Sequence, residues 1–138
     1  MVIERFEDLQ CWQEARALAR IVYALSRNPT FDEDRDLRWQ MRAAAVSAMG
    51  NIAEAHGRYS FEDKRRFLDI AAGSCKETQS HGYVALDQGY ITENEFRDAH
   101  AQAETVGRLL SGMIANLECQ ISARQSAGKR MRSTRNRP

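Results

Sequence analysis

QMRAAAVSAMGNIAEAHGRYS, residues 40–60, contains most of one helix, its end and the start of the next helix. Apolar side chains recur at spacings of three and four, which places them on one face of a helix. These side chains are Met41, Ala44, Ala45, Ala48 and Ile52, and Leu37, just before the stretch, continues the same spacing. Gly57 can take the left-handed conformation that ends a helix, and Ser60 with Asp63 has the spacing of an N-terminal cap. The sequence therefore predicts a helix over 37–55, a break and another helix.

The same analysis predicts four helices in all, over 8–27, 37–55, 61–88 and 93–123. Asp8 is a candidate N-cap for the first helix, and Thr92 with Glu95 has the spacing of a capping box for the last. Apolar residues of the last helix alternate by three and four, as in the seam of a bundle. Four helices with short breaks predict an all-α fold, an up-and-down antiparallel four-helix bundle over 1–123.

Length, hydropathy and cysteine content limit the class of protein. The chain has 138 residues, which is enough for one domain with its own core. It has no apolar run of membrane-spanning length and no signal-peptide pattern, so we expect a cytoplasmic protein that does not contact a membrane. The cysteines are widely spaced and form no CxxC motif, which favours reduced, buried thiols. They are Cys11, Cys75 and Cys119.

The charge is concentrated at the C-terminal end. Residues 124–138 contain six basic residues and no acidic one, whereas the rest of the chain is net acidic. This composition, mixed with Ser, Gly and Asn and without apolar periodicity, predicts a disordered tail that can contact phosphates. Because the tail has no aromatic residue, such binding should be salt-sensitive and largely independent of sequence. The alternative is a terminus that only aids solubility.

Small residues lie on several faces of the helices over 37–55 and 61–88. Gly50 and Gly73 are interior positions, where glycine costs about 1 kcal/mol relative to alanine. Close approach between helix backbones would account for this cost. A single bundle does not need small residues on so many faces, so we expect helix contacts between subunits as well.

Three segments also carry a family resemblance: FEDLQCWQEARALARIVYALS, QMRAAAVSAMGNIAEAHGRYS and FLDIAAGSCKETQSHGYVALDQGYI. In order and spacing they resemble the four-helix-bundle proteins of the 23S rRNA-intervening sequence type, over about residues 6–120. The resemblance implies a ring-like homopentamer with no established enzymatic activity. The accessory variability proteins of diversity-generating retroelements resemble the same bundle and bind nucleic acid. A role in binding RNA or DNA, or in association with rRNA, is therefore what the resemblance implies.

Two groups of basic residues are candidates for contact with phosphates. Arg42 and Arg58 match positions of the family pattern, but Ala43 follows Arg42 where the family usually has a second arginine. The loss of that arginine weakens the prediction for this helix. The other candidates belong to the tail: Arg124, Lys129, Arg130, Arg132, Arg135 and Arg137.

Polar residues of the second and third predicted helices are candidates for a structural network. Glu54 and Arg58 are four residues apart and can form an ion pair. Buried polar groups need hydrogen-bond partners, so other polar residues can join them. The predicted network contains Gln40, Asn51, Glu54, Ser74 and Glu77. His56 lies beside the turn, where it favours a helix C-terminus.

A metal site is the chemical alternative. In a hairpin centred near residue 90, His81 lies level with His100, and Glu77 lies level with Glu104. His100 and Glu104 flank the seam, however, and the Glu-x-x-His spacing of di-iron bundles is absent. We therefore predict neither a metal nor a cofactor.

The sequence also has no GxSxG, P-loop, CxxC or HExxH motif, so we predict no enzymatic activity. The leading hypothesis is an oligomeric, non-enzymatic protein that binds RNA or DNA. The alternative is an oligomeric scaffold that binds another protein.

Overall fold

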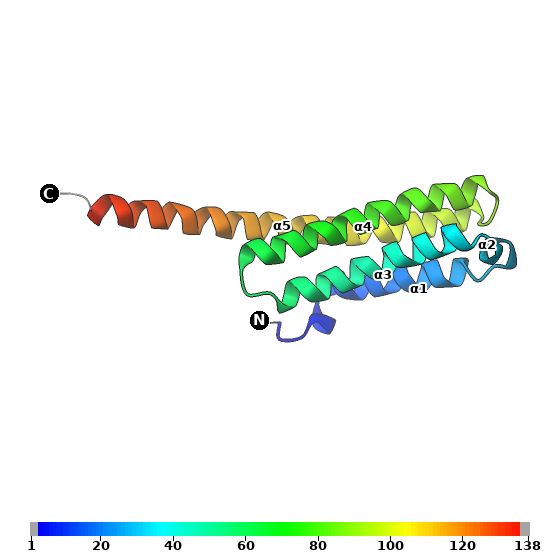
Figure 1. Ribbon diagram of the computed structural model, residues 1–138, viewed down its shortest axis with the longest axis horizontal. Helices are drawn as coiled ribbons and strands as arrows, with labels where there is room; N and C mark the ends of the chain where they lie inside the picture. Colours follow the sequence, from blue (N-terminus) through cyan, green and yellow to red (C-terminus); the bar gives the residue numbers. More distant parts are fainter. Residues whose placement is uncertain (1–2, 136–138) are drawn as a thin grey trace.

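A computed structural model describes residues 3–135, and in this range the chain forms helices and no strands (Figure 1). The prediction of an all-α fold is confirmed. The elements are η1 (Phe6–Asp8), α1 (Gln10–Leu25), α2 (Pro29–Glu33), α3 (Arg35–Gly57), α4 (Phe61–Asp87) and α5 (Glu93–Arg135).

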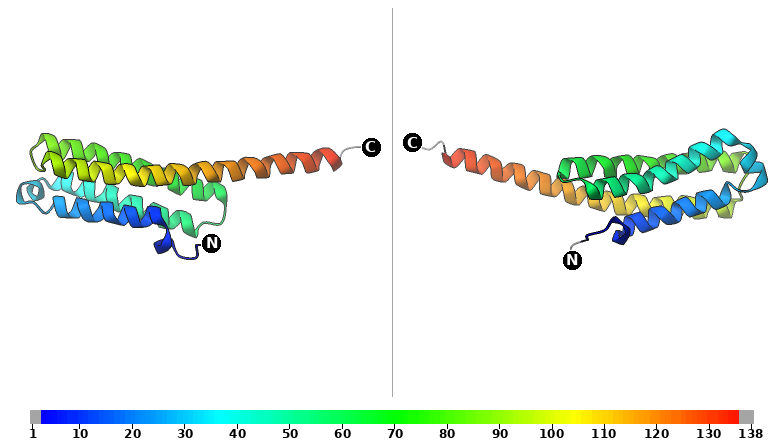
Figure 2. Two further views of the ribbon diagram at one scale, coloured as in Figure 1. Left: turned by 180° about the vertical axis from the view of Figure 1, so that it is seen from behind. Right: turned by 60° about the horizontal axis from the view of Figure 1, so that its bottom comes forward.

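The four long helices α1, α3, α4 and α5 lie side by side and alternate in direction (Figures 1 and 2). Helix α3 packs against α1 and α4, and α5 packs against the same two helices, so the four enclose a common core. No helix within residues 3–135 is long and apolar enough to cross a membrane.

Two of the predicted helix starts are confirmed in detail. The Ser60 hydroxyl accepts a hydrogen bond of 3.1 Å from the backbone N–H of Asp63, which caps α4. Thr92 and Glu95 form the reciprocal capping box, with bonds of 2.9 and 3.1 Å. These bonds satisfy backbone N–H groups that the first turn of a helix leaves unpaired.

Other helix ends differ from the sequence prediction. Asp8 lies in η1, and Leu9 occupies the N-cap position of α1 without a side-chain bond. Gly57 is the last residue of α3 and has no positive φ, which within residues 3–135 occurs only at Gly89. The end of α3 is stabilised instead by the Lys64 ammonium, which donates to two of its last backbone carbonyls.

The core divides into two apolar clusters along the bundle. One lies near the α1–α3 and α4–α5 connections, where the short helix α2 buries Phe31 completely. The other lies toward the opposite end, and its fully buried side chains include Ile52, Leu68 and Leu110. Both clusters use the apolar positions that recur at spacings of three and four.

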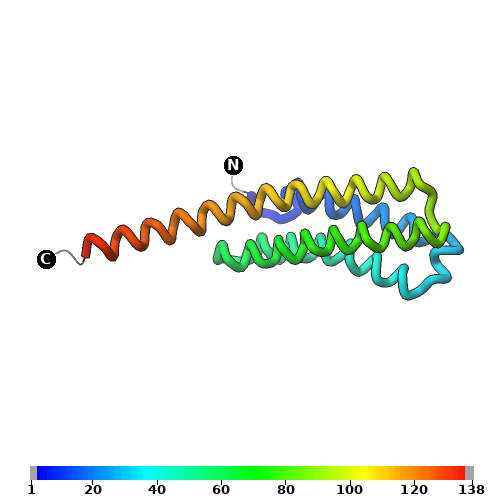
Figure 3. The backbone as a smooth tube through the Cα atoms, turned by 90° about the horizontal axis from the view of Figure 1, so that it is seen from above, coloured from blue at the N-terminus to red at the C-terminus, as the bar shows by residue number. Residues whose placement is uncertain are grey.

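Helix α5 is longer than predicted. We expected the last helix to end at residue 123 and a disordered tail to follow, but α5 continues to Arg135 and projects beyond the bundle (Figures 1 and 3). The added residues include Lys, Arg, Gln, Met and Ala, which favour helix, and cations are favoured at a helix C-terminus. Arg137, one of the predicted phosphate contacts, lies outside the described residues.

Candidate nucleic-acid interface

The projecting part of α5 begins beyond Arg124. The Arg124 guanidinium donates to the Glu62 carboxylate at 2.6 Å and lies 5.4 Å from the centre of the Phe61 ring. These contacts with the start of α4 are the last that join α5 to the bundle in the described residues. Every residue from 125 to 135 is exposed, and we call this segment the basic arm (Figure 3).

The basic arm contains cations and no acid. Its described cations are Lys129, Arg130, Arg132 and Arg135. Within residues 3–135, none of the four is part of an ion pair. The last acidic residue of the chain is Glu118, and its carboxylate already pairs with Arg65 at 2.8 Å. The arm is therefore a segment of uncompensated positive charge, as phosphate binding requires.

Arg42, in contrast, is held against the bundle. Its Nε donates a hydrogen bond of 2.7 Å to the Ser26 hydroxyl, and its guanidinium lies 4.6 Å from the centre of the Tyr23 ring. Ser26 is completely buried, so Arg42 supplies a partner to an atom that water does not reach. The structure gives this arginine a role in joining α1 to α3.

Arg58 is also engaged within the chain. It donates to the Glu54 carboxylate at 2.9 Å, and its guanidinium lies 4.6 Å from the centre of the Phe67 ring. The predicted Glu54–Arg58 ion pair is thus present, on an exposed part of α3. Because Glu54 neutralises the guanidinium, Arg58 contributes less positive field than a cation of the arm.

The predicted polar network is only partly assembled. Asn51 donates to the Ser47 carbonyl and hydroxyl at 2.8 and 3.0 Å, and the Ser47 and Ser74 hydroxyl oxygens are 2.9 Å apart. Ser47, which the prediction did not include, links Asn51 of α3 to Ser74 of α4. Its small side chain gives no signal for this role in the sequence.

The other members predicted for this network lie apart from it. Within residues 3–135, Glu54 pairs with Arg58 alone, and Glu77 pairs with His81 at 3.4 Å. Gln40 is exposed and has no side-chain hydrogen bond within the described part of the chain. The prediction that all five residues form one network is therefore wrong, because three of them lie on solvent-facing parts of α3 and α4.

The four residues of the alternative metal site do not converge. The Glu104 carboxylate accepts a hydrogen bond of 3.0 Å from the Gln79 amide and lies 3.6 Å from the Lys76 ammonium, and these contacts lower the pKa of Glu104. His100 packs against the rings of Tyr83 and Phe96. No group of three His, Cys, Asp or Glu side chains in residues 3–135 is placed to hold a metal ion.

The cysteines occupy two different environments. Cys11 and Cys75 are buried in the core, whereas Cys119 is exposed on α5, so the prediction of buried thiols is wrong for the third. Burial raises the pKa of the Cys75 thiol to about 11 and also raises that of Cys11. The nucleophilic thiolate is therefore scarce at neutral pH in the core.

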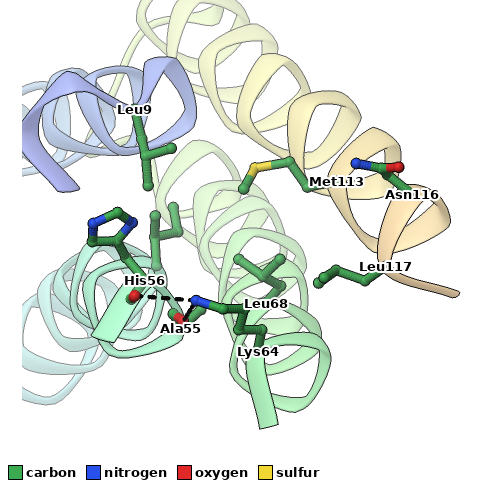
Figure 4. Close-up of a pocket in the computed structure, with 9 residues that line it drawn as sticks. Leu9, Ala55, His56, Lys64, Leu68, Met113, Asn116 and Leu117 are labelled. Carbon is green, nitrogen blue, oxygen red and sulfur yellow. Dashed lines mark hydrogen bonds between the residues drawn. The ribbon is translucent and has the colours of Figure 1, made fainter. Parts of the chain in front are cut away.

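A cavity of about 150 Å³ lies at the base of the projecting part of α5 (Figure 4). Leu9, Leu68, Met113 and Leu117 give it a mostly apolar wall. Lys64 is the cation on its rim, and its ammonium is directed at the carbonyls that end α3 (Figure 4). The cavity is thus poorly suited to phosphate.

An apolar surface on α3 faces away from the core. Trp39, Ala43, Val46 and Gly50 follow one another at spacings of four, three and four, and we call them the outer α3 face. The Trp39 side chain is 72% exposed and Val46 is 46% exposed. On α4, Ile70 is exposed as well. Exposed apolar side chains gathered on one face are typical of surfaces that contact another molecule.

Comparison with known proteins shows which solved structure the bundle resembles. A search of curated proteins finds no match. A crystal structure of a protein of unknown function from the S23 ribosomal protein family of Bacteroides thetaiotaomicron has a TM-score of 0.70 and 22% sequence identity. The alignment covers 75% of this chain and 97% of that one, and it shows a shared fold.

The family comparison covers most of the bundle and ends before the basic arm. The model described as 23S rRNA-intervening sequence protein matches residues 7–112, from η1 into the middle of α5. The resemblance noted from the sequence motifs is confirmed: the chain belongs to the family of 23S rRNA-intervening sequence proteins.

Proposed function

We propose that this protein binds RNA or DNA without catalysing a reaction, and that the basic arm is its main contact with phosphate. The observation that supports this most is the arm itself: four exposed cations without an acidic partner on a helix that leaves the bundle. The family's name adds an association with rRNA as the broader setting. The high pKa of Cys75, the most buried thiol, argues against a nucleophilic role for it.

The contacts of the basic residues decide which of them are free to bind phosphate. Arg42 and Arg58 have partners within the chain, so the proposal assigns them a minor part in binding. The arm cations extend into solvent and can exchange water for phosphate oxygens without breaking an internal contact. The arm therefore stays the leading candidate for contact with phosphate, ahead of Arg42 and Arg58.

We also propose that copies of the chain associate into a ring, the homopentamer that the family resemblance implies. The outer α3 face and the exposed Ile70 of α4 offer apolar surface to a second copy, and head-to-tail contacts between successive copies can close a ring. A ring would place several arms on one ligand and raise the overall affinity through avidity. Light scattering on Val46→Glu and on the unmodified protein tests this, since unchanged mass would reject the face as an interface.

The second candidate function is an oligomeric scaffold for another protein. The exposure of Trp39 favours it, because large aromatic side chains are enriched in protein interfaces. The two functions differ in their need for the arm. A scaffold that uses the outer α3 face should work equally well when the arm is removed.

The test of nucleic-acid binding is deletion of residues 125–138, measured by fluorescence anisotropy with labelled RNA and duplex DNA. Four phosphate contacts predict a slope of about −3.6 for log K against log salt on duplex DNA, or roughly 150-fold weaker binding at 200 mM than at 50 mM. The deletion should abolish most of this dependence. Equal affinity with and without the arm would reject the proposal.

Two matched double variants distinguish the effect of charge on the arm from the effect of the overall charge of the protein. Arg130→Gln with Arg132→Gln removes two charges from the arm, and Arg20→Gln with Arg108→Gln removes two exposed charges from the bundle. The first pair should lower the slope by about two, since each lost contact removes about 0.9. The second pair should leave it nearly unchanged, and equal effects would point to overall charge.

A further inference from the structure

We propose that the basic arm binds as a helix within the major groove of B-form duplex DNA. This inference rests on the proposed function and goes further, because it states which nucleic acid the arm fits and which side of the arm faces the bases. It does not follow from family membership, since the family match ends at residue 112 and the arm lies beyond it.

The positive charges of the arm are distributed around much of its circumference. At about 100° per residue, Arg130 lies roughly 100° to one side of Lys129, and Arg135 lies roughly 120° to the other side. The cations therefore cover an arc of about 220°. A strand of phosphates that passes along one side of a helix meets only a narrow arc. A groove has a phosphate strand on each side, which matches cations that point in opposed directions.

One side of the arm is uncharged. Ala127, Met131 and Thr134 follow at spacings of four and three, so they share one side, and we call it the base-facing strip. Arg130 and Arg135 border the strip on its two edges. Alanine and the threonine methyl group make apolar contacts with thymine, and Met131 is 74% exposed and free to do the same.

The arm also has the size of a helix that fits the major groove. Residues 125–135 extend for about 16 Å at 1.5 Å per residue, and a helix with side chains is about 10–12 Å across. The major groove of B-form DNA is about 12 Å wide and admits such a helix. The major groove of A-form RNA is deep and narrow, and it does not. The combined dimensions and charge favour duplex DNA.

The first experiment compares three probes with the full-length protein at one salt concentration. The probes are a 20-base-pair duplex DNA, one of its strands alone, and the duplex RNA of the same sequence. Binding to duplex DNA should be at least tenfold tighter than to either competitor. Equal or tighter binding of the single strand or the duplex RNA would overturn the groove inference. The proposed function would survive that outcome if deletion of residues 125–138 still weakened binding.

The second experiment tests the orientation of the arm with two tryptophan substitutions. Ala127→Trp places a large ring on the base-facing strip, and Gln125→Trp places the same ring on the opposite side of the helix. Both positions are exposed, so neither substitution disturbs the core. Ala127→Trp should weaken binding to duplex DNA by about tenfold, and Gln125→Trp should change it by less than twofold. Equal effects, or tighter binding by Ala127→Trp, would overturn the assigned orientation.

The third experiment tests whether the bound arm is helical. Gly128 is interior to α5, and a Cβ added to it would meet nothing within 4 Å. Gly128→Ala should therefore favour the helix by about fivefold and tighten binding by up to the same factor, whereas Gly128→Pro should weaken binding strongly. If Gly128→Pro bound as tightly as the unmodified protein, the arm would not bind as a helix.

Discussion

The contact between Arg42 and Ser26 makes a quantitative prediction about stability. The Arg42 Nε donates to the Ser26 hydroxyl at 2.7 Å, and the same hydroxyl donates to the Val22 carbonyl at 2.7 Å. The guanidinium also packs on Tyr23. Replacing Arg42 with alanine removes both of its contacts and leaves the buried Ser26 oxygen without a donor. The variant should therefore be less stable but should retain its affinity for nucleic acid.

The size of the effect follows from the two contacts. A hydrogen bond from a charged donor contributes about 1.5–3 kcal/mol, and a partly exposed cation–π contact about 0.5–1 kcal/mol. We expect Arg42→Ala to lower the free energy of unfolding by about 2–4 kcal/mol. Ser26→Ala should lower it by about 1–2 kcal/mol. In a double-mutant cycle, the two substitutions should show a coupling energy of about 1–2 kcal/mol.

The assay is urea unfolding followed by circular dichroism, at one protein concentration because association between copies would add to apparent stability. Arg20→Ala, a substitution of an exposed arginine on α1, is the control and should change stability by less than about 0.5 kcal/mol. A coupling energy below about 0.5 kcal/mol would refute the structural role of Arg42. So would unchanged stability combined with a tenfold loss of affinity for nucleic acid, which would make Arg42 a ligand contact.

Three further predictions concern other parts of the molecule. Cys119 should react with a thiol reagent at pH 8 in the folded protein, whereas Cys75 should react only in urea, because burial raises its pKa to about 11; mass spectrometry identifies the labelled site. Ser60→Ala should cost about 1 kcal/mol in urea unfolding through loss of the α4 cap, and Ser60→Gly less. Glu104 has a lowered pKa through its bond from Gln79, so its stabilising contribution is complete above the unfolded value of 4.5 and is lost as pH falls through the folded value. Glu104→Gln should therefore show a smaller loss of stability than the unmodified protein between pH 5 and pH 3, in the same assay.

Local signals in the sequence predicted most of the fold. Apolar spacing located the four long helices, and the capping pairs at Ser60 and Thr92 fixed where α4 and α5 begin. Local signals failed where a distant contact decides the structure. Gly57 was expected to end α3 in a left-handed conformation, but the Lys64 side chain from α4 satisfies those carbonyls instead.

The basic residues show a different limit of sequence reasoning. A basic segment without apolar periodicity predicted disorder after residue 123, but the structure continues α5 as a helix to Arg135. Lys, Arg and Gln have high helix propensity, and a segment that extends an existing helix needs no new nucleus, so the helix continues without an apolar face.

The candidate site depended even more on contacts that no motif encodes. Arg42 and its partner Ser26 are sixteen positions apart: Arg42 lies on α3, and Ser26 is the C-cap of α1. The Ser47 hydroxyl group joins Asn51 to Ser74. The family pattern identified Arg42 as a residue to consider, but only the packing of α1 against α3 shows that its guanidinium is already occupied.

The arm and the core share one unbroken helix, and this has a mechanical consequence. Leu110, in the centre of the bundle, and Arg135, near the tip of the arm, are separated by about 37 Å along a single rod. The direction and rotation of the arm are therefore set by how α5 packs in the core. A ligand bound at the tip of the arm is held at a fixed angle to the bundle. A force on that ligand is transmitted along α5 to the core as torque.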